Sequence, residues 1–118
     1  MNRIRIAVLA VLAALVVAVA AQAASKGSVL TGTVGPGFTI TLTQGGKKVT
    51  ALKAGTYTIR VVDKSNIHNF HLTGPGVNKM TSVPFVGTQS WTLPLKKGTY
   101  KFVCDPHSTF MKGSFKVS

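Results

Sequence analysis

The sequence contains few acidic residues and a single cysteine. Among its 118 residues, 14 are lysine or arginine, whereas only Asp63 and Asp105 carry a carboxylate side chain. Two carboxylates are too few for a hydrolase that works with paired carboxylates, or for a calcium or magnesium site built only from oxygen ligands. Because Cys104 is the only cysteine, an internal disulfide is excluded. The length allows one domain at most.

The first 23 residues have the three-part pattern of a secretory signal peptide. Arg3 and Arg5 precede an uncharged, alanine- and valine-rich run over 6–21, and an Ala-x-Ala sequence follows. We expect cleavage at the end of this segment, which leaves 24–118 as the mature domain, exported to a periplasm, the medium or the cell surface. After cleavage we expect no stable membrane insertion. The alternative is a signal helix that is retained in the membrane, because the apolar run approaches the length of a membrane span.

The mature domain is predicted to consist of short β-strands. Apolar and polar residues alternate in several segments that Gly and Pro residues separate, and no segment after the signal has a sustained helical period. Many short, regularly spaced strands in a domain of this size are typical of a Greek-key β-sandwich, so we predict an all-β fold. The alternating segments are 38–43, 57–61, 100–104 and 115–117.

One short motif occurs twice in the mature domain. The sequence Leu-Lys-Ala-Gly-Thr-Tyr over 52–57 resembles Leu-Lys-Lys-Gly-Thr-Tyr over 95–100. Duplicated halves would explain the repeat, but we favour a turn that leads into a strand, with the tyrosine fixing the corner. On this interpretation the motif carries no chemistry by itself.

The stretch after the second copy contains three side chains that bind soft metals. Strand alternation places Cys104 on the aromatic face of the 100–104 strand, and this face must be buried. His107 and Met111 follow closely, on a loop that Pro106 is predicted to keep out of regular structure. Thiolate, imidazole and thioether are soft or borderline ligands, which together favour a soft metal ion. A complete site needs one more donor from elsewhere in the chain.

The candidates for this further donor are His68 and His71. If 67–72 forms a strand, alternation places His68 on the apolar face with Phe70, whereas His71 lies on the other face with Asn69. His68 is therefore the preferred ligand, unless a β-bulge shifts the register. A buried structural histidine is the usual interpretation of such a residue, but a lone exported cysteine with a histidine and a methionine close by requires a partner.

The combined donor set indicates a particular metal. Two imidazoles, one thiolate and one thioether match the ligands of a blue copper electron-transfer centre, so we predict one type 1 copper ion. Imidazole suits Cu(II), thiolate binds both oxidation states, and a distant soft methionine favours Cu(I). Zinc is a weaker alternative, because structural zinc sites prefer four strong donors. Met80 is a weaker alternative to Met111 as the axial ligand, because methionine commonly fills gaps in cores.

Two segments of the mature domain carry the motifs of a known protein family. They are Ile-His-Asn-Phe-His-Leu over 67–72 and Tyr-Lys-Phe-Val-Cys-Asp-Pro-His over 100–107. Both are similar to the ligand segments of the cupredoxins, in particular the small plastocyanin, pseudoazurin and amicyanin group. The resemblance implies a cupredoxin-like β-sandwich that transfers electrons and is not an enzyme. The ligands that it implies are His68, Cys104 and His107 in the equatorial plane and Met111 on the axis.

The resemblance also implies where electrons enter and leave. In this family the exposed edge of the ligand histidine at His107 is the port for electrons. Apolar residues are expected to surround this port, namely Phe110 and Pro106 together with Phe85 and Pro84. Filling the core is an equally open role for Phe110.

Asp105 is the clearest departure from the family pattern, because relatives have serine or threonine after the cysteine. We predict that the Asn69 side-chain amide donates a hydrogen bond to this carboxylate and so connects the two ligand segments. The alternative is a carboxylate that points into solvent. The spacing from His107 to Met111 also differs from that of the nearest relatives, so the resemblance does not determine the reduction potential.

The positive charge restricts the choice of partners. The formal charge of +12 decreases slightly when the signal is removed, and it favours an anionic partner. We expect a monomeric carrier and a redox partner protein with an acidic docking surface. Export, dispersed lysines and the lack of a nucleic-acid motif argue against binding of nucleic acid. A copper-delivery protein with the same site is the first alternative, and a basic adhesive sandwich with a vestigial site is the second.

Overall fold

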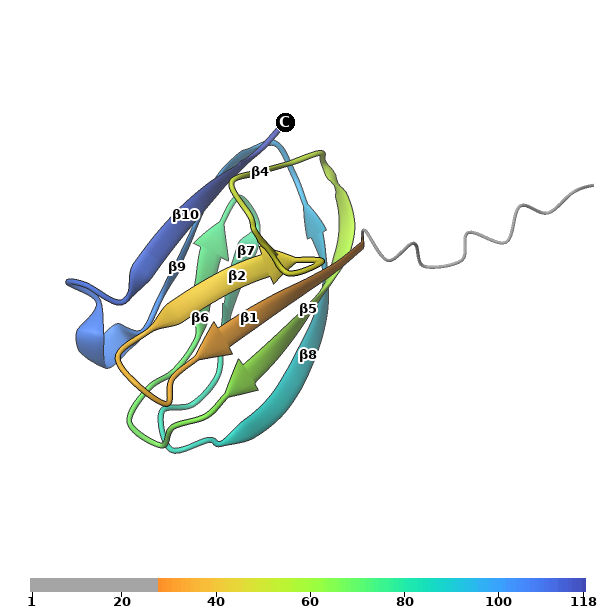
Figure 1. The fold of residues 1–118 in the computed structure, drawn as a ribbon. Helices are drawn as coiled ribbons and strands as arrows, with labels where there is room; N and C mark the ends of the chain where they lie inside the picture. Colours follow the sequence, from red (N-terminus) through yellow and green to blue (C-terminus); the bar gives the residue numbers. More distant parts are fainter. Residues whose placement is uncertain (1–27) are drawn as a thin grey trace, which may run out of the picture.

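The computed structural model describes residues 28–118, which form two β-sheets packed into a sandwich (Figure 1). The predicted signal segment, residues 1–23, lies outside the described part of the chain. Within residues 28–118, no helix has the length and apolar character needed to span a membrane. The all-β prediction is therefore confirmed for the part of the mature domain that the structure describes.

The first sheet has the strand order β3-β2-β1-β5-β8. Strands β1 and β5 are parallel, whereas the other neighbours are antiparallel. A parallel pair needs a long connection, and here the chain visits the other sheet between β1 and β5. The strands of this sheet are β1 (Val29–Val34), β2 (Ile40–Gln44), β3 (Lys47–Lys48), β5 (Gly55–Asp63) and β8 (Gly87–Leu95).

The second sheet has the order β4-β10-β9-β6-β7. Its neighbours are antiparallel except for the short pair of β4 and β10. The chain passes repeatedly between the two sheets, as a Greek-key sandwich requires (Figure 1). The strands of this sheet are β4 (Ala51–Leu52), β6 (His71–Gly74), β7 (Val77–Met80), β9 (Gly98–Val103) and β10 (Lys112–Val117).

Four loops meet at one end of the sandwich. Strands β1 and β5 end opposite each other, at Val34 and Asp63. Strand β9 ends at Val103, which pairs with His71 at the start of β6 and with Lys112 at the start of β10. The pairing of β6 with β7 and of β5 with β8 brings one more loop to this end. The four loops are 35–39, 64–70, 81–86 and 104–111.

The core lies between the sheets, and some of its buried aromatic residues lie next to the loop end. The predicted inner face of β9 is confirmed, since Tyr100 and Cys104 are fully buried and Phe102 is 3% exposed. The ring of Phe70 stacks on that of Phe102, with centroids 5.7 Å apart and planes 7° from parallel. Because Phe70 lies at the end of loop 64–70, this stacking anchors the loop to the core.

The repeated motif forms two equivalent corners. The Tyr57 hydroxyl donates to the backbone oxygen of Lys53 at 2.7 Å, and the Tyr100 hydroxyl donates to that of Lys96 at 2.9 Å. Each tyrosine thus ties the start of its strand to the turn before it. The interpretation of this motif as a turn leading into a strand is confirmed.

Gly74 offers a test of how tightly β6 packs against the neighbouring strand β9. A Cβ atom at this position would overlap the ring of the fully buried Tyr100, which cannot move aside. We expect Gly74→Ala to lower the free energy of unfolding by about 1–3 kcal/mol, the usual cost of overpacking a core. Denaturant unfolding of the metal-free protein measures this change.

Gly37→Ala is the matched control, because a Cβ atom at Gly37 would have no heavy atom within 4 Å apart from those of Gly37 and its two chain neighbours. Its midpoint of unfolding is expected to stay close to that of the wild type. Equal midpoints for the two variants would show that Gly74 does not pack closely against the Tyr100 ring.

Candidate metal centre

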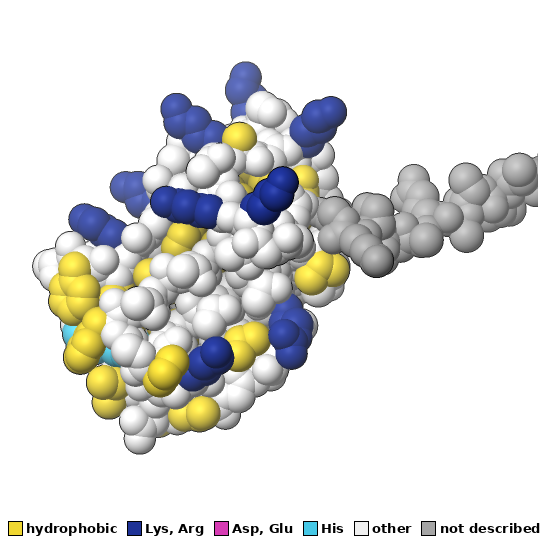
Figure 2. All heavy atoms as spheres, viewed as in Figure 1, with side chains coloured by type: hydrophobic (Ala, Val, Ile, Leu, Met, Phe, Trp, Pro, Cys, Tyr) yellow, Lys and Arg dark blue, Asp and Glu magenta, His cyan; other side chains and the backbone are white. Residues whose placement is uncertain are grey.

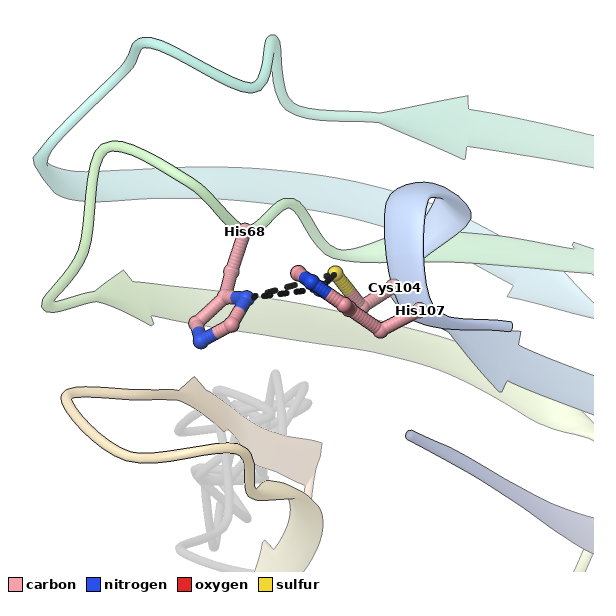
Figure 3. Close-up of side chains that lie close together, drawn as sticks. All are labelled: His68, Cys104 and His107. Atoms are coloured by element: carbon pink, nitrogen blue, oxygen red, sulfur yellow. Dashed lines mark hydrogen bonds between the residues drawn. The ribbon is translucent and has the colours of Figure 1, made fainter. Parts of the chain in front are cut away.

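Three of the predicted ligands lie together at the loop end. His68 comes from loop 64–70, whereas Cys104 and His107 flank the turn after β9, and the three side chains point toward one another (Figure 3). One potential ligand atom from each lies within 4.8 Å of the other two. The two histidine Nδ1 atoms are 3.1 Å apart, and Cys104 Sγ lies 3.7 Å from Nδ1 of His68 and 3.5 Å from Nδ1 of His107.

These distances fit a single metal ion between the three atoms. Metal–nitrogen bonds of about 2.0 Å and metal–sulfur bonds of about 2.3 Å in a trigonal plane place the donors about 3.6 Å apart. The observed separations of 3.1, 3.5 and 3.7 Å are close to this value. The donor set of two imidazoles and one thiolate is the one that copper uses in trigonal blue centres. The residues present therefore fit a copper ion.

The position of His68 differs in detail from the sequence prediction. Residues 67–72 do not form one strand, because β6 begins only at His71 and 64–70 is a loop. His68, Asn69 and Phe70 are all at most 2% exposed, so the expectation that Asn69 lies on the opposite, outer face is wrong. The loop turns three successive side chains inward, which the two-residue period of a strand does not allow. The Nε2 atom of His68 is buried without a protein partner, while its Nδ1 atom faces the other donors.

His107 and Met111 are held by a compact turn. Pro106 lies in the first turn of a 3-10 helix, η2 (Asp105–His107), so the expectation that Pro106 keeps this loop out of regular structure is wrong. Proline is favoured at the start of a helix because its missing N–H is not needed there. The backbone N–H of Met111 donates to the oxygen of His107 at 2.9 Å, and that of Cys104 donates to the oxygen of Met111 at 3.0 Å. These bonds close the turn onto the end of β9.

The structure separates the remaining candidate ligands. Met111 is 1% exposed and lies at the base of the turn, and its role as the axial ligand stays a prediction. Met80, the weaker alternative, is 50% exposed at the end of β7. His71 lies outside the cluster of donors, because its two ring nitrogens bond to Asp105 and Asn78.

Asp105 and Asn69 connect the two ligand segments. The Asn69 side-chain N–H donates to the Asp105 carboxylate at 2.7 Å, which confirms the predicted bond and excludes a carboxylate that points only into solvent. In return, the backbone N–H of Asp105 donates to the side-chain oxygen of Asn69 at 2.7 Å. Since Asn69 follows His68 and Asp105 follows Cys104, these two reciprocal bonds join the residues next to two donors.

The environment of Asp105 and His71 changes the pKa of both side chains. Burial would raise the pKa of Asp105, but the hydrogen bonds from Asn69 and His71 and the charge of His71 outweigh burial and lower the pKa. Burial would lower the pKa of His71, but its hydrogen bonds with Asp105 and Asn78 and the charge of Asp105 outweigh burial and raise the pKa. Both shifts favour the pair of imidazolium and carboxylate, whose closest atoms are 2.8 Å apart.

Aromatic rings cover the outer side of the donor cluster. The Phe38 ring stands edge-on to His68 at 5.2 Å and to His107 at 5.0 Å, and Phe110 lies 5.7 Å from His107. The expected contact of Phe110 with His107 is confirmed. The role of Phe38 was missed, because its place in an alternating segment indicated a strand. The residues Gly35, Pro36 and Gly37 were the available signal, since they place Phe38 in a loop before β2.

Solved structures show the same fold. The chain resembles reduced rusticyanin solved at 1.9 Å, with 23% sequence identity, a TM-score of 0.56, and coverage of 76% of this chain and 78% of that one. It also resembles rusticyanin from Thiobacillus ferrooxidans at 1.27 Å, with 24% identity, a TM-score of 0.54 and coverage of 76% of each chain. No curated protein matches the chain in sequence.

A family comparison agrees with the geometry of the site. Residues 38–118 match the copper-binding proteins of the plastocyanin/azurin family, and this range contains every residue of the donor cluster. The His-Cys-His cluster with a buried methionine close to it in sequence fits the copper of this family. The chain belongs to the plastocyanin/azurin family of copper-binding proteins, the cupredoxins, and its centre takes one type 1 copper ion.

Proposed function

We propose that the protein carries single electrons between redox partners, with His68, Cys104 and His107 as equatorial copper ligands and Met111 as the axial ligand. The observation that supports this best is that three donor atoms lie 3.1–3.7 Å apart at the loop end of the sandwich. Copper bound there would supply a one-electron couple between Cu(II) and Cu(I). The proposal involves no turnover of a substrate.

Rigidity of the site supports electron transfer. Cys104 and His68 are fully buried, and the turn that holds His107 is closed by backbone hydrogen bonds. Because the donors cannot move apart and the site cannot flatten, the reorganisation energy between the two oxidation states stays small. Phe38 and Phe110 limit the access of water to the donors, while His107 remains partly exposed between them. We assign the exposed edge of His107 as the port for electrons.

The surface supports an anionic partner. In Figure 2, most lysine and arginine side chains lie on the upper part of the visible face, whereas hydrophobic side chains gather beside the histidine at the loop end. Of the only two carboxylates in the chain, Asp63 is buried and Asp105 is paired with His71. We therefore propose a docking mode in which the apolar loop end makes close contact and the lysines attract an acidic redox protein. The signal-like sequence of residues 1–23 supports a location of the carrier outside the cytoplasm.

Spectra of the copper-loaded protein and its variants test the ligand set. Addition of Cu(II) to the mature domain is expected to give an intense blue colour and a small copper hyperfine splitting, because the thiolate is a direct ligand in a trigonal site. Cys104→Ala and His68→Ala should abolish the colour, whereas His71→Ala should retain it. Met111→Gln should stay blue with a lower reduction potential, since an oxygen donor stabilises Cu(II) more than a thioether does.

Optical and electron paramagnetic resonance spectra measure these outcomes. A pale, tetragonal spectrum of the wild type would contradict the type 1 assignment. Loss of colour in His71→Ala but not in His68→Ala would show that the assignment of His68 as a ligand is wrong. Transfer of copper to an acceptor protein faster than electron exchange would instead favour the alternative of copper delivery.

The second prediction tests the electrostatic part of docking with two small redox probes, anionic hexacyanoferrate(III) and cationic tris(phenanthroline)cobalt(III). Lys112 directly follows Met111 at the loop end, so Lys112→Gln should slow the reaction with the anion about threefold at low salt. Stopped-flow kinetics of the reduced protein measure the rate constants. The reaction with the cation should become faster, because one repulsive charge is removed.

Lys53→Gln is the matched control for this experiment. Lys53 lies just before the start of β5, whereas Asp63 at the end of β5 lies at the loop end. Lys53 is therefore a full strand length away from the loop end. This length, about 30 Å, is several times the Debye length of about 10 Å at 0.1 M salt, so the rate should be unchanged there. Equal effects of the two substitutions would mean that electrons do not pass through the loop end.

A further inference from the structure

A group of polar side chains beside the donors has no role in the function proposed so far. His71 at the start of β6 bonds to Asp105 through one ring nitrogen and to Asn78 on β7 through the other. We name His71, Asn78, Asp105 and Asn69 the carboxylate cluster. Within it, His71 Nδ1 lies 2.8 Å from one carboxylate oxygen of Asp105 and 3.1 Å from the other. Its Nε2 atom lies 2.6 Å from the side-chain oxygen of Asn78.

The Asp105 carboxylate needs support to keep its orientation. Its side chain is 43% exposed, and the terminal torsion of an aspartate is broad when nothing restrains it. The bond from Asn69 uses one carboxylate oxygen and therefore depends on this torsion. The same Asn69 amide accepts from the backbone N–H of Asp105 and donates to the backbone oxygen of Thr81 at 3.2 Å. A rotated carboxylate would remove the shorter of the two bonds that this amide donates and so loosen its hold on the backbone of Asp105.

His71 is well placed to supply this support, because its own position is fixed twice. Its backbone pairs with Val103 on β9 and with Met80 on β7. Its ring is held between Asp105 and Asn78, and its side chain is only 17% exposed. A hydrogen bond to a carboxylate from such a restrained donor is strong and directional.

We propose that His71 is a positioning residue of the copper site. It holds the Asp105 carboxylate so that Asn69 can bind both the carboxylate and the backbone N–H of Asp105. In this way it fixes the segment of Cys104 against the segment of His68. The part of this inference that concerns copper rests on the proposed function, whereas the part that concerns the two segments applies to the metal-free protein as well.

Hydrogen exchange in the metal-free protein tests the inference directly. The probe is the backbone N–H of Asp105, which donates to Asn69 at 2.7 Å. In His71→Val, which suits a strand but lacks the donor, its exchange relative to that of the Phe102 N–H should be about tenfold faster. In His71→Asn, whose amide nitrogen replaces Nδ1, the ratio should stay near the wild-type value. Nuclear magnetic resonance measures both rates in one sample, which corrects for any loss of global stability.

Thr73→Val is the matched control, because Thr73 lies two residues further along the same face of β6. This variant should leave the exchange ratio unchanged. Equal ratios in His71→Val, Thr73→Val and the wild type would overturn the inference, and so would a ratio in His71→Asn as high as in His71→Val.

The copper-loaded variants provide a second readout. His71→Val should remain blue but show a larger copper hyperfine splitting than the wild type, because the thiolate and imidazole segments are less well aligned. His71→Asn and Thr73→Val should match the wild type, and an unchanged splitting in His71→Val would contradict the role at copper. If the wild-type protein does not turn blue, the proposed function is wrong, while the exchange ratio still decides whether His71 positions the two segments.

Discussion

The antiparallel pairing of β6 with β9 is the interaction on which the metal centre depends. Leu72 pairs with Phe102, which places the start of one strand beside the end of the other. His68 lies just before the first strand and Cys104 just after the second, so strand pairing brings together donors that are distant in sequence. One ladder hydrogen bond contributes only about 1 kcal/mol, and burial of Leu72 on β6 and of Phe102 on β9 adds to the stability of this pairing.

Positioning of the donors occurs at two levels. The sandwich brings the loops to one end, and stacking of Phe70 on Phe102 anchors loop 64–70 there. Hydrogen bonds between Asn69 and Asp105 then align the two segments more finely. Apart from Asp63, Asp105 is the only side-chain carboxylate of the sequence, and it lies beside the ligands and bonds to Asn69 and His71. With so few carboxylates, the lysines and arginines give the chain a formal charge of +12, which is the basis of the proposed docking to an anionic partner.

The sequence was informative where the strands are regular and less so where the chain leaves them. Alternation correctly predicted the buried face of Tyr100 and Cys104, because a paired strand keeps its two-residue period. The same rule failed at Asn69, since loop 64–70 turns inward to reach the core. Phe38 was missed because its contact with the histidines depends on how loop 35–39 lies against loops 64–70 and 104–111. The bond of His71 to Asp105 was also missed, as it depends on side-chain orientation across β6 and β9.

The central claim is that the fold holds His68, Cys104 and His107 in place whatever the state of the metal. Crystal structures of the protein without metal, with Cu(I) and with Cu(II) test it most directly. The account predicts that the Nδ1 and Sγ atoms of these residues shift by less than about 0.5 Å among the three structures. Separation of the donors by more than about 1 Å, or refolding of loop 104–111 when copper is removed, would contradict it.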